Sequence, residues 1–314
     1  MAIGYQITPS PQKHLYQVQL SFIATSAHQE LSLPTWIPGS YMVREFSKNI
    51  IALSVSQAQI ELRSEQINKN TWLISGLEVG LSVSVNYTVY AYEYGIRTAF
   101  LDHTRGYFNP SSLCLAVVGC ETSPHKVSFI DLPTNWQVAS GLNQTSENIF
   151  VAQDYDELLD MPFELGRFKR LEFMVAGVPH YLVLSGTILP FDEARILADM
   201  YKVCEYQINL FGGVAPYQNY TFILNLSGEI LTGLEHRNST LLMAPAHSPP
   251  MALSRAKSFW LDTWHCCAIN RRKLPSGNKP AKKARHWWSS KGSGQSGKDC
   301  ESATGLGCIS QSGR

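Results

Sequence analysis

Chemically reactive side chains gather at three places in this sequence of 314 residues. An Asp beside a His suggests a catalytic dyad, a run of acids suggests a cation site, and a His next to an Arg could contact a substrate. The three places are Asp102-His103 with Arg105, the acids of DYDELLD at 154–160, and Glu235-His236-Arg237 within GLEHRNST.

The first two places lack the companions that their chemistry requires. No Ser or Cys nucleophile string accompanies Asp102 and His103, which favours a structural loop. The acids at 154–160 lack the Gly and the closing Glu of an EF-hand loop, which favours a solvated loop or a domain boundary. At the third place, His236 could bind substrate, bind a metal or hydrogen-bond within the wall of the site. Arg237 could clamp a peptide carbonyl or pair with an internal acid.

The histidines and cysteines predict no metal site in this chain. The nine histidines lie at positions 14, 28, 103, 125, 180, 236, 247, 265 and 286. No two of them are four residues apart, so no helix can present the His pair of an HExxH zinc site. His265, Cys266 and Cys267, with Cys300 and Cys308, lack the Cys-x2-Cys spacing of a zinc site. An odd total of seven cysteines favours free thiols over a disulfide framework.

The elements that must position these residues are mainly strands over the first part of the chain. Apolar and polar residues alternate over 16–22 and 81–89, and more briefly over 51–55, which indicates strands with one buried face. Turn signals such as Pro38-Gly39 separate them. We therefore expect a mainly β protein, with an antiparallel β-sandwich domain at 1–185.

The pattern changes after residue 185. A stripe of apolar residues predicts a helix over 192–211, capped by Asp192 and ended by Gly212-Gly213. A buried strand is expected at 220–226, followed by a polar turn and another strand. Residues 186–245 are thus predicted to form an incomplete α/β domain. We expect Leu197, Val203, Ile223 and Leu242 to lie on exposed apolar faces, so that a chain ending near Gly186 would be more soluble.

Residues 246–314 differ from the rest in charge and composition. Residues 265–314 hold ten Lys and Arg and two acids, a net charge of +8, whereas residues 1–264 hold 16 bases and 23 acids, a net charge of −7. Ser and Gly supply half of the last 26 residues, which is typical of a disordered tail. Basic residues at 271–285 and Trp287-Trp288 could contact nucleic acid, but no nucleic-acid fold precedes them, and we expect no such partner.

Four strings resemble the glycyl aminopeptidase family of zinc metallopeptidases, in the order and approximate spacing of that family. The resemblance covers about residues 5–245. The strings are TWIPGSYMVREFSKNI, YEYGIRTAFLDHTRGYFNPSSL, DYDELLDMPFELGRFKRLEFMVAGVPHYLVLSG and GLEHRNST. It implies an N-terminal β-domain, then a thermolysin-like catalytic domain and commonly a PDZ domain. It also implies removal of N-terminal residues, preferably glycine, by a zinc-activated water.

The family resemblance also implies a role for GLEHRNST. In related aminopeptidases the comparable string lies along the substrate, and its Glu binds the free α-amine. Glu235 would then bind the amine, with the main chain of Gly233 and Leu234 pairing with the substrate as an added strand, beside His236 and Arg237. A fixed carboxylate explains exopeptidase action because it requires a chain end. Thr232 stands where the family has a further Gly, which hinders close approach of a backbone.

The sequence departs from the family after GLEHRNST. No HExxH follows, and the periodicity and the charge change together, which a reading-frame shift near codons 244–260 explains as one event; a genuine lineage-specific tail is the alternative. We therefore expect a truncated, catalytically inactive chain that binds no zinc, with peptides bearing a free N-terminus as its partners. A non-catalytic peptide- or protein-binding module is the alternative function. No apolar run is long enough to span a membrane and no secretory signal begins the sequence, so a cytoplasmic location is expected.

Overall fold

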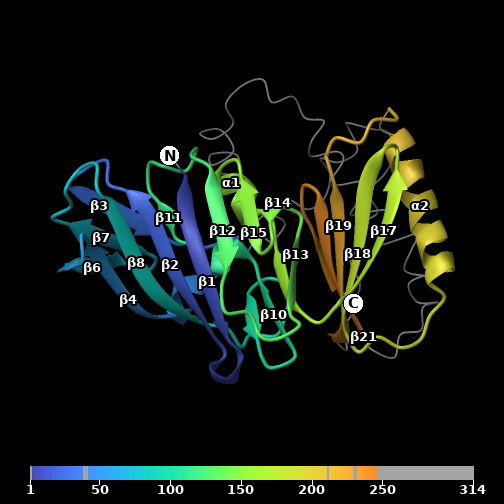
Figure 1. The fold of residues 1–314 in the computed structure, drawn as a ribbon, viewed down its shortest axis with the longest axis horizontal. Coiled ribbons are helices and arrows are strands. Elements are labelled where there is room, and N and C mark those ends of the chain that lie inside the picture. Colours follow the sequence, from blue (N-terminus) through green and yellow to red (C-terminus); the bar gives the residue numbers. More distant parts are fainter. Residues whose placement is uncertain (1, 38–41, 211, 229–231, 246–314) are drawn as a thin grey trace. The chain divides into compact units, whose positions relative to one another are not determined.

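The computed structural model describes residues 2–37, 42–210, 212–228 and 232–245. Strands dominate the described residues and form four sheets (Figure 1). The predicted mainly β class is therefore confirmed. The tail predicted at 246–314 lies outside the described residues.

The largest sheet has eight strands. Neighbouring strands in this sheet are antiparallel, except for the parallel pair β1 and β12. In spatial order the strands are β14 (Asn143–Ser146), β15 (Ile149–Ala152), β12 (His125–Phe129), β1 (Ile3–Ser10), β2 (Leu15–Ile23), β8 (Ser82–Tyr90), β4 (Ile50–Gln57) and β5 (Ile60–Leu62).

Two four-stranded antiparallel sheets complete the N-terminal part. The first contains β13 (Gln137–Ser140), β16 (Phe163–Gly166), β10 (Arg105–Phe108) and β9 (Ala99–Leu101). The second contains β11 (Ala116–Val117), β3 (His28–Ser32), β7 (Thr71–Ser75) and β6 (Ser64–Asn68). A short helix, α1 (Tyr155–Leu159), precedes β16.

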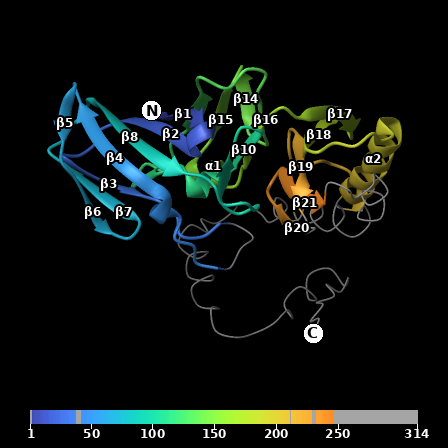
Figure 2. The ribbon, with the colours of Figure 1, turned by 90° about the horizontal axis from the view of Figure 1, so that it is seen from below.

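The fourth sheet has five strands, of which the central three are parallel. In spatial order they are β17 (Lys169–Val175), β18 (Val178–Gly186), β19 (Tyr220–Gly228), β21 (Ser239–Pro245) and β20 (Thr232–Glu235). Helix α2 (Glu193–Leu210) connects β18 to β19 and packs on β17, beside which Figures 1 and 2 show it. This β-α-β connection starts on β18, within residues 1–185 that the sequence analysis assigned to the N-terminal β-domain, and continues into residues 186–245.

Both faces of the five-stranded sheet are buried at its central strands, whereas edge strand β17 exposes Arg170, Glu172 and Met174 on one face. One face packs with Ile196, Met200 and Cys204 of α2. The other joins the core of the N-terminal sheets through Val183, Ile223, Leu234, Leu241 and Met243. Parallel strands require cover on both faces, and here the N-terminal part supplies the second cover. The expectation of exposed apolar faces is therefore wrong for Ile223 and Leu242, which are 0% and 5% exposed, while Leu197 and Val203 are half-buried.

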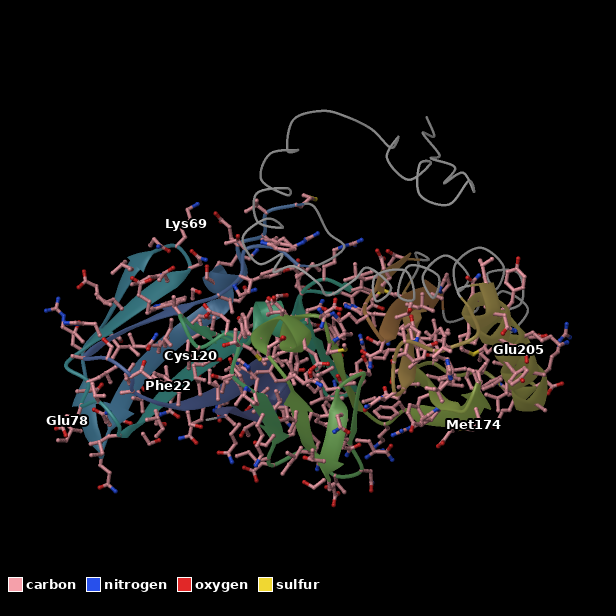
Figure 3. The ribbon with its side chains drawn as sticks, turned by 90° about the horizontal axis from the view of Figure 1, so that it is seen from above. Phe22, Lys69, Glu78, Cys120, Met174 and Glu205 are labelled. Carbon is pink, nitrogen blue, oxygen red and sulfur yellow. The ribbon has the colours of Figure 1, made fainter. Side chains whose placement is uncertain are left out.

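The alternating segments form strands as predicted. Tyr16, Val18, Leu20 and Phe22 of β2 are buried in the core, whereas Leu15 and Ile23 at its two ends are half-buried. Figure 3 shows Phe22 inside the molecule and Lys69 and Glu78 at its periphery. Ile51 and Leu81 are exceptions, because alternation placed both inside and both are exposed. Leu81 lies just before β8 begins. The register of β4 against β8 shifts between Ile50 and Ala52, and such a bulge leaves one residue unpaired and turns its side chain outward.

Helix α2 begins and ends close to the predicted residues. Asp192 accepts a hydrogen bond from the Arg195 backbone N–H at 3.0 Å, which caps the helix. Gly213 adopts a φ of 77° and donates its N–H to the Ile208 carbonyl at 2.9 Å, which ends the helix. Leu210, placed on the buried stripe, is exposed instead. Neither described helix combines the length and the apolar character that crossing a bilayer requires.

Three buried tyrosines fix the irregular segment 113–115 to the core. The hydroxyls of Tyr87, Tyr155 and Tyr5 donate to the carbonyls of residues 113, 114 and 115 at 2.9, 2.6 and 2.7 Å. Buried carbonyls outside regular structure need such partners. Burial raises the pKa of all three hydroxyls well above the usual value, so they remain donors at any physiological pH.

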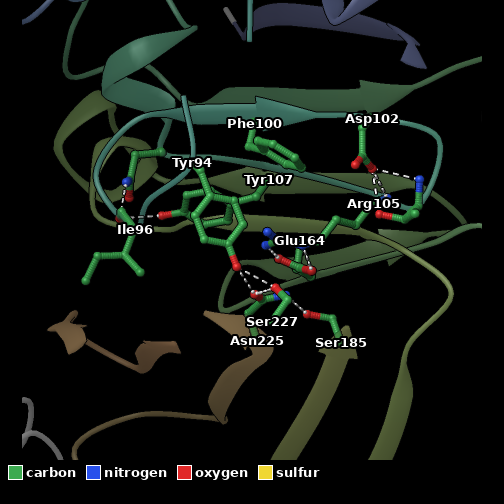
Figure 4. A network of polar contacts seen from close by, with 12 residues as sticks. Tyr94, Ile96, Phe100, Asp102, Arg105, Tyr107, Glu164, Ser185, Asn225 and Ser227 are labelled. Carbon is green, nitrogen blue, oxygen red and sulfur yellow. Dashed lines mark hydrogen bonds and ion pairs between the residues drawn. The ribbon is translucent and has the colours of Figure 1, made fainter. Parts of the chain in front are cut away.

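A buried ion pair joins β10 to β16. Arg105 donates through Nε and Nη2 to the two carboxylate oxygens of Glu164, at 2.9 and 2.7 Å, and the side chains are 7% and 0% exposed. Phe100 and Tyr107 place their ring centroids 5.6 and 5.8 Å from the guanidinium carbon (Figure 4). The two hydrogen bonds of this bidentate pair and the faces of the two rings compensate both charges for the hydration that they lose on burial.

We predict that Glu164→Gln destabilises the protein by about 3–5 kcal/mol, because it leaves the Arg105 charge buried without a counter-charge. Urea unfolding measures this, and Arg105→Met/Glu164→Met should cost less than the sum of the two single changes. The exposed pair Glu45–Lys69 provides the control, since Glu45→Gln should change stability much less. Equal losses for Glu164→Gln and Glu45→Gln would contradict the prediction.

We also predict that His180 makes the protein sensitive to acid. Its ring is fully buried between Phe173, Tyr217 and Tyr220, and burial lowers its pKa to about 4. The unfolded chain binds a proton at higher pH than the folded one, so the stability present above about pH 6.5 declines by roughly 2–3 kcal/mol as the pH falls to about 4.

The measurement is urea unfolding of the wild type, His180→Gln and the exposed control His28→Gln at several pH values. The wild type and His28→Gln should lose stability in parallel between pH 6.5 and 4, whereas His180→Gln should show a shallower decline. Three parallel curves would refute the role of His180.

Candidate functional site

Strand β20 lies at the edge of the five-stranded sheet. Its only neighbour among the described strands is β21, with Gly233 opposite Leu242, Leu234 opposite Leu241 and Glu235 opposite Thr240. The other side of an edge strand presents N–H and C=O groups to whatever approaches it. Thr232–Glu235, predicted to be part of a polar turn, is therefore a short strand that could pair with an extended peptide.

The two faces of β20 differ in character. Leu234 is 1% exposed and packs in the N-terminal core, which anchors the strand. Side chains alternate along a strand, so Glu235 and Gly233 lie on the opposite face, and Glu235 is half-buried. Thr240, opposite Glu235, is buried and shares a hydrogen bond of 2.5 Å with the Tyr220 hydroxyl. The strand thus carries one carboxylate at its end, on the same face as Gly233, which has no side chain.

The turn after β20 places His236 and Arg237 very differently. His236 is 1% exposed, and its Nδ1 lies 3.3 Å from Oδ1 of Asp160. The Arg237 side chain is exposed, while its backbone N–H donates to Oδ2 of Asp160 at 2.9 Å. The imidazole of His236 is thus directed at an internal acid in the wall of the site. Roles of His236 and Arg237 in substrate binding stay predictions.

The same turn is held by a second segment of the N-terminal part. Asn238 donates from its side-chain amide to the Gly141 carbonyl at 2.7 Å, and the Thr221 hydroxyl donates to the Ser140 carbonyl at 3.3 Å. A Cβ on Gly141 would lie 2.9 Å from Sδ of Met161 and 3.2 Å from Cβ of Ser239, so a side chain at this position would force its neighbours to move.

Asp102 stabilises a turn in this structure. Its Oδ1 accepts hydrogen bonds from the Thr104 and Arg105 backbone N–H groups at 2.7 and 3.0 Å, and from the Thr104 hydroxyl at 2.6 Å. Burial opposes ionisation, but these bonds outweigh it and lower the pKa of the Asp102 carboxyl. Its contacts are those of a loop-forming aspartate.

The acidic run 154–160 forms helix α1 and its two ends. Asp154 accepts from the Glu157 N–H at 2.7 Å, and Glu157 accepts from the Gln153 N–H at 2.7 Å, which is a reciprocal capping arrangement. Asp160, at the end of the helix, is 5% exposed. The expectation of a solvated loop is therefore wrong for Asp160. The Asp-x-x-Glu spacing could have indicated the helix, but nothing local could have indicated the contact with His236.

A polar network connects the N-terminal part to the ends of β18 and β19 (Figure 4). The hydroxyls of Tyr94 and Ser227 share a hydrogen bond of 2.6 Å, and Ser227 donates to Asn225. Asn225 in turn donates to the Ser185 hydroxyl at 2.9 Å. Tyr94 therefore fixes the carboxyl ends of two parallel strands, a contact that sequence patterns did not indicate.

The described residues do not fit the zinc site of an HExxH peptidase. Within them, no three His, Cys, Asp or Glu side chains gather closely enough to hold a metal ion. His265 and the cysteines at 266, 267, 300 and 308 lie outside the described residues. Nothing in the geometry described above therefore involves a metal.

Comparison with known proteins gives matches over most of the described residues. Residues 4–167, just over half of the chain, match the Peptidase M61 N-terminal domain. The structure is similar to that of an aminopeptidase N family protein from Idiomarina loihiensis, with 40% sequence identity and a TM-score of 0.77, over 85% of this chain and 47% of that protein. This chain thus spans about half the length of that protein.

A second solved structure, an M1 zinc metallopeptidase from Deinococcus radiodurans, has 12% identity and a TM-score of 0.48, over 79% of this chain and 60% of that protein. No curated protein matches the sequence.

Proposed function

Because this chain belongs to the M61 peptidase family, whose N-terminal domain residues 4–167 match, we propose that it binds peptides by their free N-terminal amine. In this proposal the Glu235 carboxylate accepts hydrogen bonds from the α-ammonium group. The backbone of Gly233 and Leu234 pairs with the first residues of the peptide. The N-terminal residue best suited is glycine, as the family resemblance implies.

The observation that carries the proposal is the place of Glu235 at the end of an edge strand. A peptide that adds to β20 extends the sheet by main-chain hydrogen bonds, which are independent of its sequence. Glu235 lies on the face of β20 opposite the buried Leu234, so its carboxylate is not enclosed in the N-terminal core. An ammonium group paired with a carboxylate in this half-buried place gains a charge-assisted hydrogen bond that an acetylated chain end lacks.

The proposal separates binding from hydrolysis. Peptide cleavage in the family is assigned to a zinc-activated water, and this sequence has no two histidines four residues apart. We propose that the chain binds peptides without cleaving them. The proposal combines the two hypotheses that the sequence leaves open. The chain is related to peptidases, and it acts as a non-catalytic binding module.

We predict that Glu235→Gln weakens binding of a fluorescent glycyl peptide about 10- to 100-fold, the value of one charge-assisted hydrogen bond of roughly 1.5–3 kcal/mol. Fluorescence anisotropy with the full chain measures the dissociation constant. N-acetylation of the peptide should weaken binding to the wild type by a similar factor and should have little further effect on Glu235→Gln. Glu30→Gln, an exposed change on β3, is the matched control. Unchanged affinity for Glu235→Gln would refute the proposal.

We further predict that the purified 314-residue chain does not hydrolyse a glycyl anilide, with or without added Zn²⁺. Release of the aniline is followed by absorbance against a buffer control. Zinc-dependent turnover that co-purifies with the chain and disappears on chelation would refute the non-catalytic part of the proposal and leave the binding part standing.

A further inference from the structure

Asp160 occupies a position from which it controls the turn beside Glu235. It ends helix α1, 76 residues before His236, and is 5% exposed. Both of its carboxylate oxygens are directed at the turn: Oδ1 lies 3.3 Å from Nδ1 of His236, and Oδ2 accepts from the Arg237 N–H at 2.9 Å. A carboxylate only accepts, so Nδ1 of His236 carries the hydrogen in this pair.

These contacts act on the two residues that directly follow Glu235. The His236 N–H donates to the Ser239 carbonyl at 2.9 Å, which closes the turn between β20 and β21. Strand β20 has four residues and, among the strands that the structure describes, pairs with β21 alone, so few ladder hydrogen bonds within these strands hold it. Its position therefore depends on how its end is fixed, and Asp160 fixes that end at a backbone N–H and at a side chain together.

The opposite side of the turn is fixed by Asn238 on the Gly141 carbonyl. Asp160 and Gly141 of the N-terminal part thus both hold the turn. Gly141 cannot carry a side chain without striking Met161 or Ser239, so the contact is tight. Small displacements of this turn pass to Glu235, because one peptide unit links it to His236.

We infer that Asp160 is a positioning residue for peptide binding, which holds Glu235 in register with the amine of a peptide added to β20. This inference rests on the proposed function. Asp160 acts through the turn and does not itself contact the peptide. This role differs from a general contribution to stability because it predicts two specific effects. A change at Asp160 should alter recognition of the peptide amine, and it should alter which ring nitrogen of His236 carries the hydrogen.

The test uses Asp160→Asn in the full chain, with Asp156→Asn, an exposed change on the same helix, as the matched control. Asparagine keeps the shape of the side chain but can donate to Nδ1 of His236. We expect the hydrogen on the His236 ring to move to Nε2, seen in the ¹⁵N chemical shifts of the imidazole. We also expect affinity for the free glycyl peptide to fall about 10-fold while affinity for the acetylated peptide stays unchanged.

A double-mutant cycle separates this inference from the proposed function. If Asp160 acts through Glu235, Asp160→Asn should cause little further loss in the Glu235→Gln background. If Glu235→Gln has no effect, the proposed function fails. If Glu235→Gln weakens binding but Asp160→Asn does not, or if the two effects simply add, the positioning role fails and the proposed function stands.

A second variant guards against misfolding. Asn238→Ala removes the other anchor of the turn without changing charge. It should weaken binding of the free peptide relative to the acetylated one, with the same lack of additivity toward Glu235→Gln. Far-UV circular dichroism checks that each variant is folded. A folded Asn238→Ala chain with wild-type discrimination between the two peptides would overturn the inference.

Discussion

The five-stranded sheet needs apolar cover on both faces, and this need organises the described part of the protein. Its central strands are parallel, and an exposed face on such strands would leave rows of Leu, Ile and Phe in water. Helix α2 covers one face. The other is buried against the N-terminal sheets, where Ile223 and Leu241 are part of the same core as the strands of the first 166 residues. The two parts therefore stabilise each other.

This shared core explains why polar contacts between the two parts are so specific. Groups trapped beside an apolar interface lose water and must find partners in the protein. Asp160 hydrogen-bonds to the turn after β20, and the Asn238 amide hydrogen-bonds to the Gly141 carbonyl. Each contact also fixes an end of a strand that local sequence would leave free to shift. The peptide-binding strand that we propose is thus held from outside its own sheet.

Buried charge follows the same physical rule at two places. Arg105 and Glu164 form a bidentate pair between aromatic rings, and Asp160 is shared between an imidazole and a backbone N–H. Each charged group is surrounded by donors or by π faces that compensate for lost hydration. Glu235, the residue that we propose to bind the peptide amine, is half-buried at a sheet edge.

The sequence by itself determined the elements whose signals are local. Alternation along β2 and β8, the Asp192 cap and the Gly212-Gly213 stop depend on residues within a few positions of one another, and the structure has them where they were predicted. The resemblance to the family, which four strings of residues carry, was likewise recognised from the sequence without the structure.

Only the tertiary structure decided which segments far apart in the sequence contact one another. The bulge at Ile51 arises from pairing with β8, the cover over Ile223 comes from distant strands, and the partner of Asp160 is 76 residues away. The edge position of β20 also depends on the order of strands in the sheet. Such contacts join segments that no periodicity connects, because a local pattern specifies which face of an element is buried and not which segment buries it.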